Sequence, residues 1–88
     1  MQPYVKIYLD YFDYKTQNEV LCEACQALAN DIHHIHGRGK DRNVIGNLIA
    51  LCRRHHEMAH FSKNYIAPEQ FQLIHNYFMQ GRRQRFLT

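Results

Sequence analysis

The chain has 88 residues, of which 45% are hydrophobic and 22% charged, and its formal net charge is +3. This length leaves room for one small core, and the apolar and aromatic content excludes a disordered chain. The longest apolar run has five residues, too short to cross a bilayer. Because Lys6, Asp10 and Asp13 interrupt the N-terminal apolar segment, we also expect no signal peptide. The sequence predicts one cytoplasmic domain over residues 1–88 with no membrane partner.

The N-terminal extension, residues 1–19, contains an aromatic segment over residues 4–14. Its apolar residues follow a helical repeat at Val5, Tyr8, Leu9 and Phe12. This spacing favours an amphipathic helix, while the aromatic content leaves a strand as the alternative.

A short strand, a second short element and a helix are predicted in the middle of the chain. The strand is expected at Ala29–Ile35 and the second element at Asn47–Leu51. The helix runs from Arg53 to about Phe61, where good helix formers occur without glycine or proline. The loop after the strand, residues 37–42, is rich in glycine and charge, which suits a hairpin or a loop facing phosphate.

A last helix is predicted over residues 68–80. Pro68 suits its first position and Gly81 suits its end. Its apolar stripe consists of Phe71, Ile74 and Phe78. Residues 82–88 would then form a basic tail.

Charge is divided unevenly along the chain. Residues 1–36 carry two basic and five acidic groups, whereas residues 37–88 carry nine basic and three acidic groups. The basic half favours an anionic partner, with nucleic acid first, although a solvated basic surface is the alternative. The residues expected to contact nucleic acid are Arg38, Lys40, Arg42, Arg53 and Arg54.

Three cysteines and one histidine form a first candidate metal site. Cys22 and Cys25 are separated by two residues, and so are Cys52 and His55. Three thiolates and one imidazole at this spacing are typical of a closed, tetrahedral structural zinc site. Buried free cysteines are the alternative.

The remaining histidines suggest a second site. Six of the seven histidines lie between His33 and His60. His56 and His60 share a helix face at i and i+4, and His33 would complete a three-imidazole set with open positions. Such a site suits a catalytic divalent ion, which the ligands leave open among Mg²⁺, Mn²⁺, Ni²⁺ and Zn²⁺. An unrelated pair of surface histidines is the alternative.

Several of these segments together resemble the HNH endonuclease family. The matching residues are Cys22-x2-Cys25, Asp31-Ile-His-His-Ile35, Asn47-Leu-Ile-Ala-Leu-Cys-Arg-Arg-His-His56 and His60. The resemblance covers residues 20–61 and implies a small α+β fold: a treble-clef-like ββα-metal core with a structural zinc knuckle, flanked here by N- and C-terminal helices.

The resemblance also implies a role for each matching residue. His34 would be the general base, Asn47 would brace the loop and orient the base, and His56 would be the final histidine of the motif. His33, His56 and His60 would hold the catalytic ion. Because side chains alternate along a strand, His33 and His34 are expected on opposite faces unless they lie at a strand end, and Asp31, in phase with His33, is a reserve ligand.

The implied activity is metal-dependent hydrolysis of DNA phosphodiester bonds by nicking or cutting, with weak sequence specificity. A phage or mobile-element context, a homodimer or a larger phage or restriction assembly is the expected setting. The alternative is a non-catalytic, zinc-stabilised nucleic-acid-binding module, and a third possibility is a protein-interaction domain. His36 and His75 are assigned no catalytic role.

Overall fold

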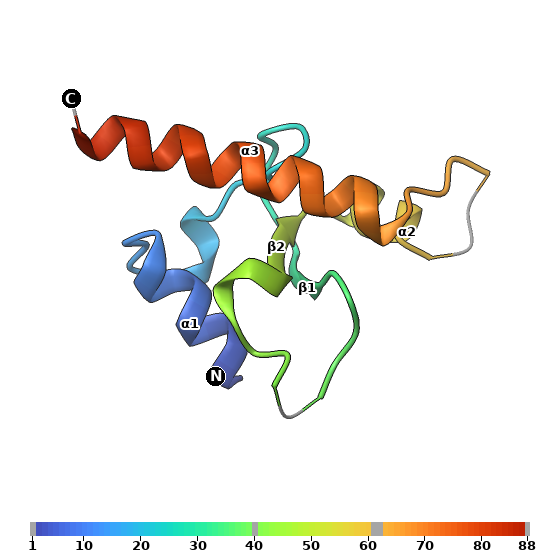
Figure 1. Cartoon of the computed structure of the whole chain (residues 1–88), viewed down its shortest axis with the longest axis horizontal. Coiled ribbons are helices and arrows are strands. Elements are labelled where there is room, and N and C mark those ends of the chain that lie inside the picture. The colour runs from blue at the N-terminus through green and yellow to red at the C-terminus, as the bar shows by residue number, and fades with distance from the viewer. Residues whose placement is uncertain (1, 40, 61–62, 88) are drawn as a thin grey trace.

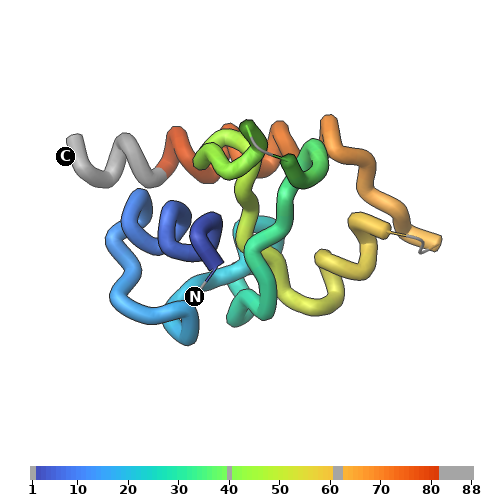
Figure 2. Tube along the Cα trace, turned by 90° about the horizontal axis from the view of Figure 1, so that it is seen from below, coloured from blue at the N-terminus to red at the C-terminus, as the bar shows by residue number. Residues whose placement is uncertain are grey.

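The computed structural model describes residues 2–39, 41–60 and 63–87, with side chains described only as far as Gly81 in the last helix. Lys40 and Phe61, to which the sequence assigned a nucleic-acid contact and a helix end, lie outside this part. The elements follow the order helix, strand, strand, helix, helix. The longest helix runs along one side, with the other elements beneath it (Figures 1 and 2).

The N-terminal segment is the expected helix rather than a strand. Helix α1 spans Pro3–Tyr11, with proline near its start, and a short 3₁₀ turn follows at Gln17–Glu19. The helical repeat turns Val5, Tyr8 and Leu9 to the interior. After the helix the chain reverses at Asp13, whose φ is +59°.

A β-hairpin forms the centre of the molecule. Strand β1, Asp31–His34, pairs antiparallel with β2, Leu48–Leu51, so that Asp31 faces Leu51 and His34 faces Leu48. Strand β1 is shorter than the predicted Ala29–Ile35, and the second predicted element is strand β2. Asn47, expected in that second element, closes a 3₁₀ turn at Ile45–Asn47 instead.

The two faces of the hairpin each carry a hydrophobic cluster. Leu48 and Ala50 pack with α1, whereas Ile49 and Leu51 pack on the other face with Phe71 of the last helix. Every residue of β2 is therefore buried, which explains why its sequence is continuously apolar rather than alternating.

Two helices complete the fold. Helix α2, Arg53–Met58, follows β2 directly, and α3 spans Pro68–Leu87. The predicted end at Gly81 was wrong: a glycine ends a helix by adopting positive φ, and Gly81 does not do so. The backbone of residues 82–87, predicted as a tail, is thus helical.

The described residues make a small α+β structure with a two-stranded sheet. None of the helices in this part of the chain has the length and apolarity that crossing a bilayer requires.

Candidate metal centres

The Cys22–Cys25 segment folds as a tight turn. A bridge between Leu21 and Leu28 closes it, the Cys22 amide donates to the Ala27 carbonyl at 2.7 Å, and the Gln26 amide donates to the Cys22 carbonyl at 2.8 Å. This geometry brings both thiols to one side of the turn, as the two-residue spacing predicted.

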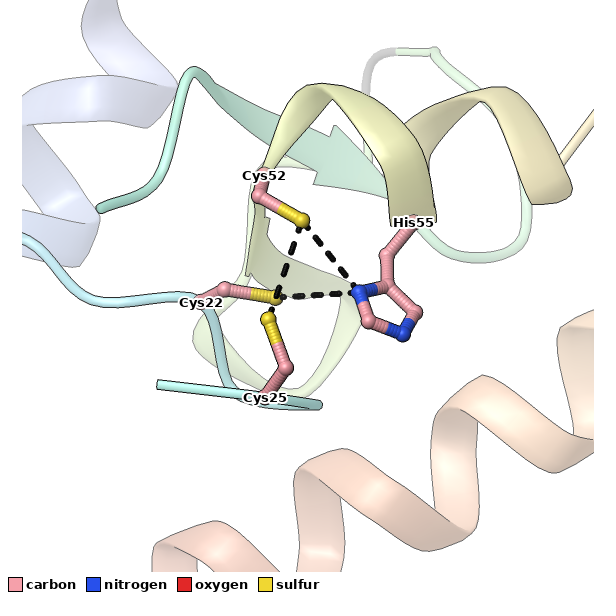
Figure 3. A group of neighbouring side chains, drawn as sticks. All are labelled: Cys22, Cys25, Cys52 and His55. Atoms are coloured by element: carbon pink, nitrogen blue, oxygen red, sulfur yellow. Dashed lines mark hydrogen bonds between the residues drawn. The ribbon is translucent and has the colours of Figure 1, made fainter. Parts of the chain in front are cut away.

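The second pair of ligands comes from the start of α2. Cys52 lies immediately before the helix and His55 lies in its first turn, so the side chains of both meet the cysteine turn (Figure 3). The distances are 3.8 Å between the Cys25 and Cys52 sulfurs, and 3.2 and 3.7 Å from His55 Nδ1 to the sulfurs of Cys52 and Cys22.

These distances fit zinc. A tetrahedral ion with usual bond lengths places two sulfurs about 3.8 Å apart and a sulfur about 3.6 Å from a nitrogen. All four ligand atoms lie within 4.8 Å of one another. The cluster of Cys22, Cys25, Cys52 and His55 is therefore able to hold a structural zinc ion.

The thiols differ in their tendency to ionise. Burial raises the pKa of the Cys22 thiol. Burial also raises the pKa of Cys52, but hydrogen bonds from His55 and contacts with the other two thiols outweigh it and lower the pKa to about 7. Cys52 is thus readily deprotonated at neutral pH, the form in which a cysteine binds metal.

A second cluster lies on the other side of α2. His33 comes from β1, His56 from α2 and His60 from the turn after it, and one ring nitrogen from each lies within 4.8 Å of the other two. The ring centroids are 4.9 to 5.8 Å apart. Because His60 is exposed and the other two are half-buried, the cluster opens to solvent.

Burial, followed by the charges of His56, His60, His34 and Arg38, lowers the pKa of His33 to about 4. A neutral imidazole has the lone pair that a metal ligand needs. The cluster therefore disfavours three protonated rings and favours the metal-binding form of His33.

Asp31 takes a different place from the one its spacing suggested. Its Oδ2 lies 2.9 Å from Nδ1 of His56, and it is not among the residues of the three-histidine cluster. A carboxylate that accepts from Nδ1 directs Nε2 of the same ring toward a metal. Asp31 thus holds the His56 ring in one orientation.

His34 points away from this cluster, as strand alternation predicted. It is 6% exposed and contacts Tyr4 of α1, with ring centroids 4.5 Å apart. Its Nε2 lies 2.8 Å from Oδ1 of Asn43, while Nδ1 is buried without a hydrogen-bond partner among the described residues. Position at the end of β1 does not bring the ring into the cluster.

Asn47 braces the loop between the strands. Its Oδ1 accepts from the His36 amide at 2.8 Å, and its Nδ2 donates to the carbonyls of Gly37 and Arg42 at 3.2 and 2.9 Å. The side chain thus fixes both ends of the glycine loop. The contact with the His34 ring comes from Asn43, a residue that the sequence reasoning missed.

The basic residues lie in the loop of the hairpin and at the start of α2. The side chains of Arg38, Arg42, Arg53 and Arg54 are exposed. The Arg38 guanidinium lies 5.3 Å from the centre of the Tyr4 ring, which itself contacts His34. One basic residue is therefore held close to the predicted base.

A buried polar network, which the sequence did not predict, connects the Cys22–Cys25 turn to α3. Glu23 Oε1 accepts from Nδ1 of His75 at 2.8 Å, and both side chains are fully buried. Glu23 Oε2 accepts from the Tyr8 hydroxyl at 2.6 Å and from the Ala50 amide at 3.3 Å. Nε2 of His75 donates to the Ile45 carbonyl at 2.7 Å.

Both ring nitrogens of His75 therefore have hydrogen-bond partners, the Glu23 carboxyl group and the Ile45 carbonyl. The sequence gave no signal for this network, because a glutamate between two cysteines of a metal-binding turn is expected to lie on the surface. His75 and Glu23 have a structural role.

Comparisons with protein-family models, curated proteins and solved structures found no match for this chain. The resemblance to the HNH family accordingly rests on the motif residues of the sequence alone.

Proposed function

We propose that this protein is a metal-dependent endonuclease with a ββα-metal core of the HNH type, which hydrolyses DNA phosphodiester bonds. The observation that carries the proposal is the second cluster: His33, His56 and His60 converge from a hairpin and the following helix and leave one side open. A purely structural site is normally closed by four protein ligands.

The three imidazoles would hold one divalent ion, with Asp31 orienting His56. When bound, such an ion supplies positive charge to a scissile phosphate and to its leaving oxygen. The zinc cluster would fix the position of α2 relative to the hairpin, because Cys52 and His55 lie at the start of the helix that carries His56.

His34 is the proposed general base. In the hydrolysis step, a water oxygen forms the new bond to phosphorus and the water proton passes to the His34 ring. The bond to the 3′ oxygen breaks, and this oxygen takes a proton from solvent to become a hydroxyl. Nδ1 of His34 is buried, so DNA binding must expose this atom while the contact of Nε2 with Asn43 is kept. Arg38 would leave the Tyr4 ring and bind a phosphate oxygen, because a charge-assisted hydrogen bond to phosphate is stronger than the cation–π contact with Tyr4.

The burial of His34 also favours a second candidate, a zinc-stabilised module that binds nucleic acid without cutting it. The two functions differ in whether the chain breaks DNA and share the basic surface formed by Arg38, Arg42, Arg53 and Arg54.

Incubation of supercoiled plasmid with the zinc-loaded protein and Mg²⁺, Mn²⁺ or Ni²⁺ distinguishes them. The endonuclease reading predicts nicked circles with the wild-type chain and a large loss with His34→Ala. His36→Ala is the matched control, because His36 is exposed and its ring contacts Gln72 instead. DNA binding without nicking under any of these metals would support the binding module.

A further inference from the structure

The hydrogen bond between Asn43 and His34 has a chemical consequence for the ring. Oδ1 of Asn43 is a hydrogen-bond acceptor, so its 2.8 Å contact with Nε2 of His34 is a hydrogen bond when Nε2 carries the proton. In a neutral imidazole the other nitrogen, Nδ1, then holds the free lone pair.

The surroundings of Nδ1 agree with this tautomer. Nδ1 is buried and has no partner among the described residues. With the opposite tautomer, a buried N–H would lack an acceptor, which is rarer and costlier in proteins than an unpartnered lone pair. The carboxamide of Asn43 would also have to turn its NH₂ group toward Nε2.

Two further contacts hold the ring in place. The Tyr4 ring lies edge-on against it at 4.5 Å, and the backbone of His34 is fixed by its pairing with Leu48 in β2. Asn43 itself lies in the loop that Asn47 braces at Arg42, the residue immediately before Asn43. The position of the Asn43 oxygen is therefore set by the same loop geometry.

We propose that Asn43 is a positioning residue, which fixes the Nε2–H tautomer of His34 and so leaves Nδ1 as the atom that accepts the water proton. This inference rests on the proposed endonuclease function for its catalytic part. The tautomer itself is a property of the folded protein and is measured without any DNA.

The test combines nitrogen NMR with kinetics on the zinc-loaded full chain. In ¹⁵N-labelled wild-type protein at neutral pH, the His34 ring is expected to show a protonated Nε2 and an unprotonated Nδ1. In Asn43→Ala, water replaces the carboxamide and can either donate to Nε2 or accept from it, so a mixture is expected. Asn43→Asp keeps an acceptor and should restore the wild-type pattern.

The nicking rate should follow the tautomer. For Asn43→Ala we expect kcat to fall roughly ten-fold or more, since general base catalysis contributes on the order of 10²–10⁴, while KM for plasmid stays within about two-fold because Asn43 carries no charge to bind phosphate. Asn43→Asp should recover most of the kcat. Asn64→Ala, at an exposed asparagine in another loop, is the matched control.

The outcomes separate the two proposals. A wild-type ring protonated at Nδ1, or an Asn43→Ala variant with unchanged tautomer and kcat, would overturn the role of Asn43. If the wild-type chain shows the expected tautomer but nicks no DNA, the endonuclease function fails while the assignment of the ring nitrogens stands.

Discussion

Replacing His75 by phenylalanine tests the buried network between the Cys22–Cys25 turn and α3. The substitution removes the partners of Glu23 Oε1 and of the Ile45 carbonyl, at 2.8 and 2.7 Å, and leaves a carboxylate fully buried beside an apolar ring. Removing one member of a buried ion pair costs about 3–5 kcal/mol. The total stability of a chain of this length is roughly 4–13 kcal/mol, so the variant should be close to unfolding.

Urea unfolding with zinc in constant excess measures this loss, because bound metal would otherwise contribute to the difference. His36→Phe, the same substitution at an exposed histidine, should cost less than about 1 kcal/mol. The double variant Glu23→Gln/His75→Phe should lose less unfolding free energy than the two single variants together, because Glu23→Gln then removes a charge that His75→Phe has already left unpaired. A loss below about 1 kcal/mol for His75→Phe would refute the reasoning.

Three further outcomes are expected. Asp31→Asn should weaken divalent-metal binding to the three-histidine cluster about 10- to 100-fold by calorimetry, because it loosens His56; unchanged affinity would contradict this. Cys25→Ser should contain one zinc per chain fewer than the wild type by elemental analysis and should have a lower thermal midpoint, and a zinc content equal to that of the wild type would count against the site. The pKa of His33 in the folded protein is about 4, below the usual 6.5. In metal-free protein the contribution of neutral His33 to stability is therefore complete above about pH 6.5 and is lost as the pH falls through about 4. His33→Gln should flatten the pH dependence of the unfolding midpoint.

Local patterns in the sequence predicted much of the fold. The helical repeat identified α1, and the apolar stripe of α3 was correct, with Phe71 fully inside and Ile74 and Phe78 partly so. Strand lengths and the end of α3 were not predictable, because they depend on packing partners and on the φ of one glycine.

The candidate metal-binding residues were also recognisable, since a spacing of two residues, or of four on a helix, brings potential ligand atoms together whatever the tertiary fold. The contacts that orient His56 and His34 were hidden. Asp31 reaches His56, 25 positions away, because the fold brings β1 beside α2, and Asn43 reaches His34, nine positions away, because the hairpin loop returns to β1. Glu23 and His75, which are 52 positions apart, gave no signal at all.

The dependence of plasmid nicking on Mn²⁺ concentration tests the central claim, that the open cluster holds the ion used in DNA hydrolysis. With zinc-loaded wild-type protein, the nicking rate should rise and saturate at the Mn²⁺ concentration that half-fills the cluster in calorimetry. His60→Ala, which removes the exposed ligand, should shift both curves together to higher concentration. A nicking rate independent of added metal, or identical curves for the two proteins, would contradict the account.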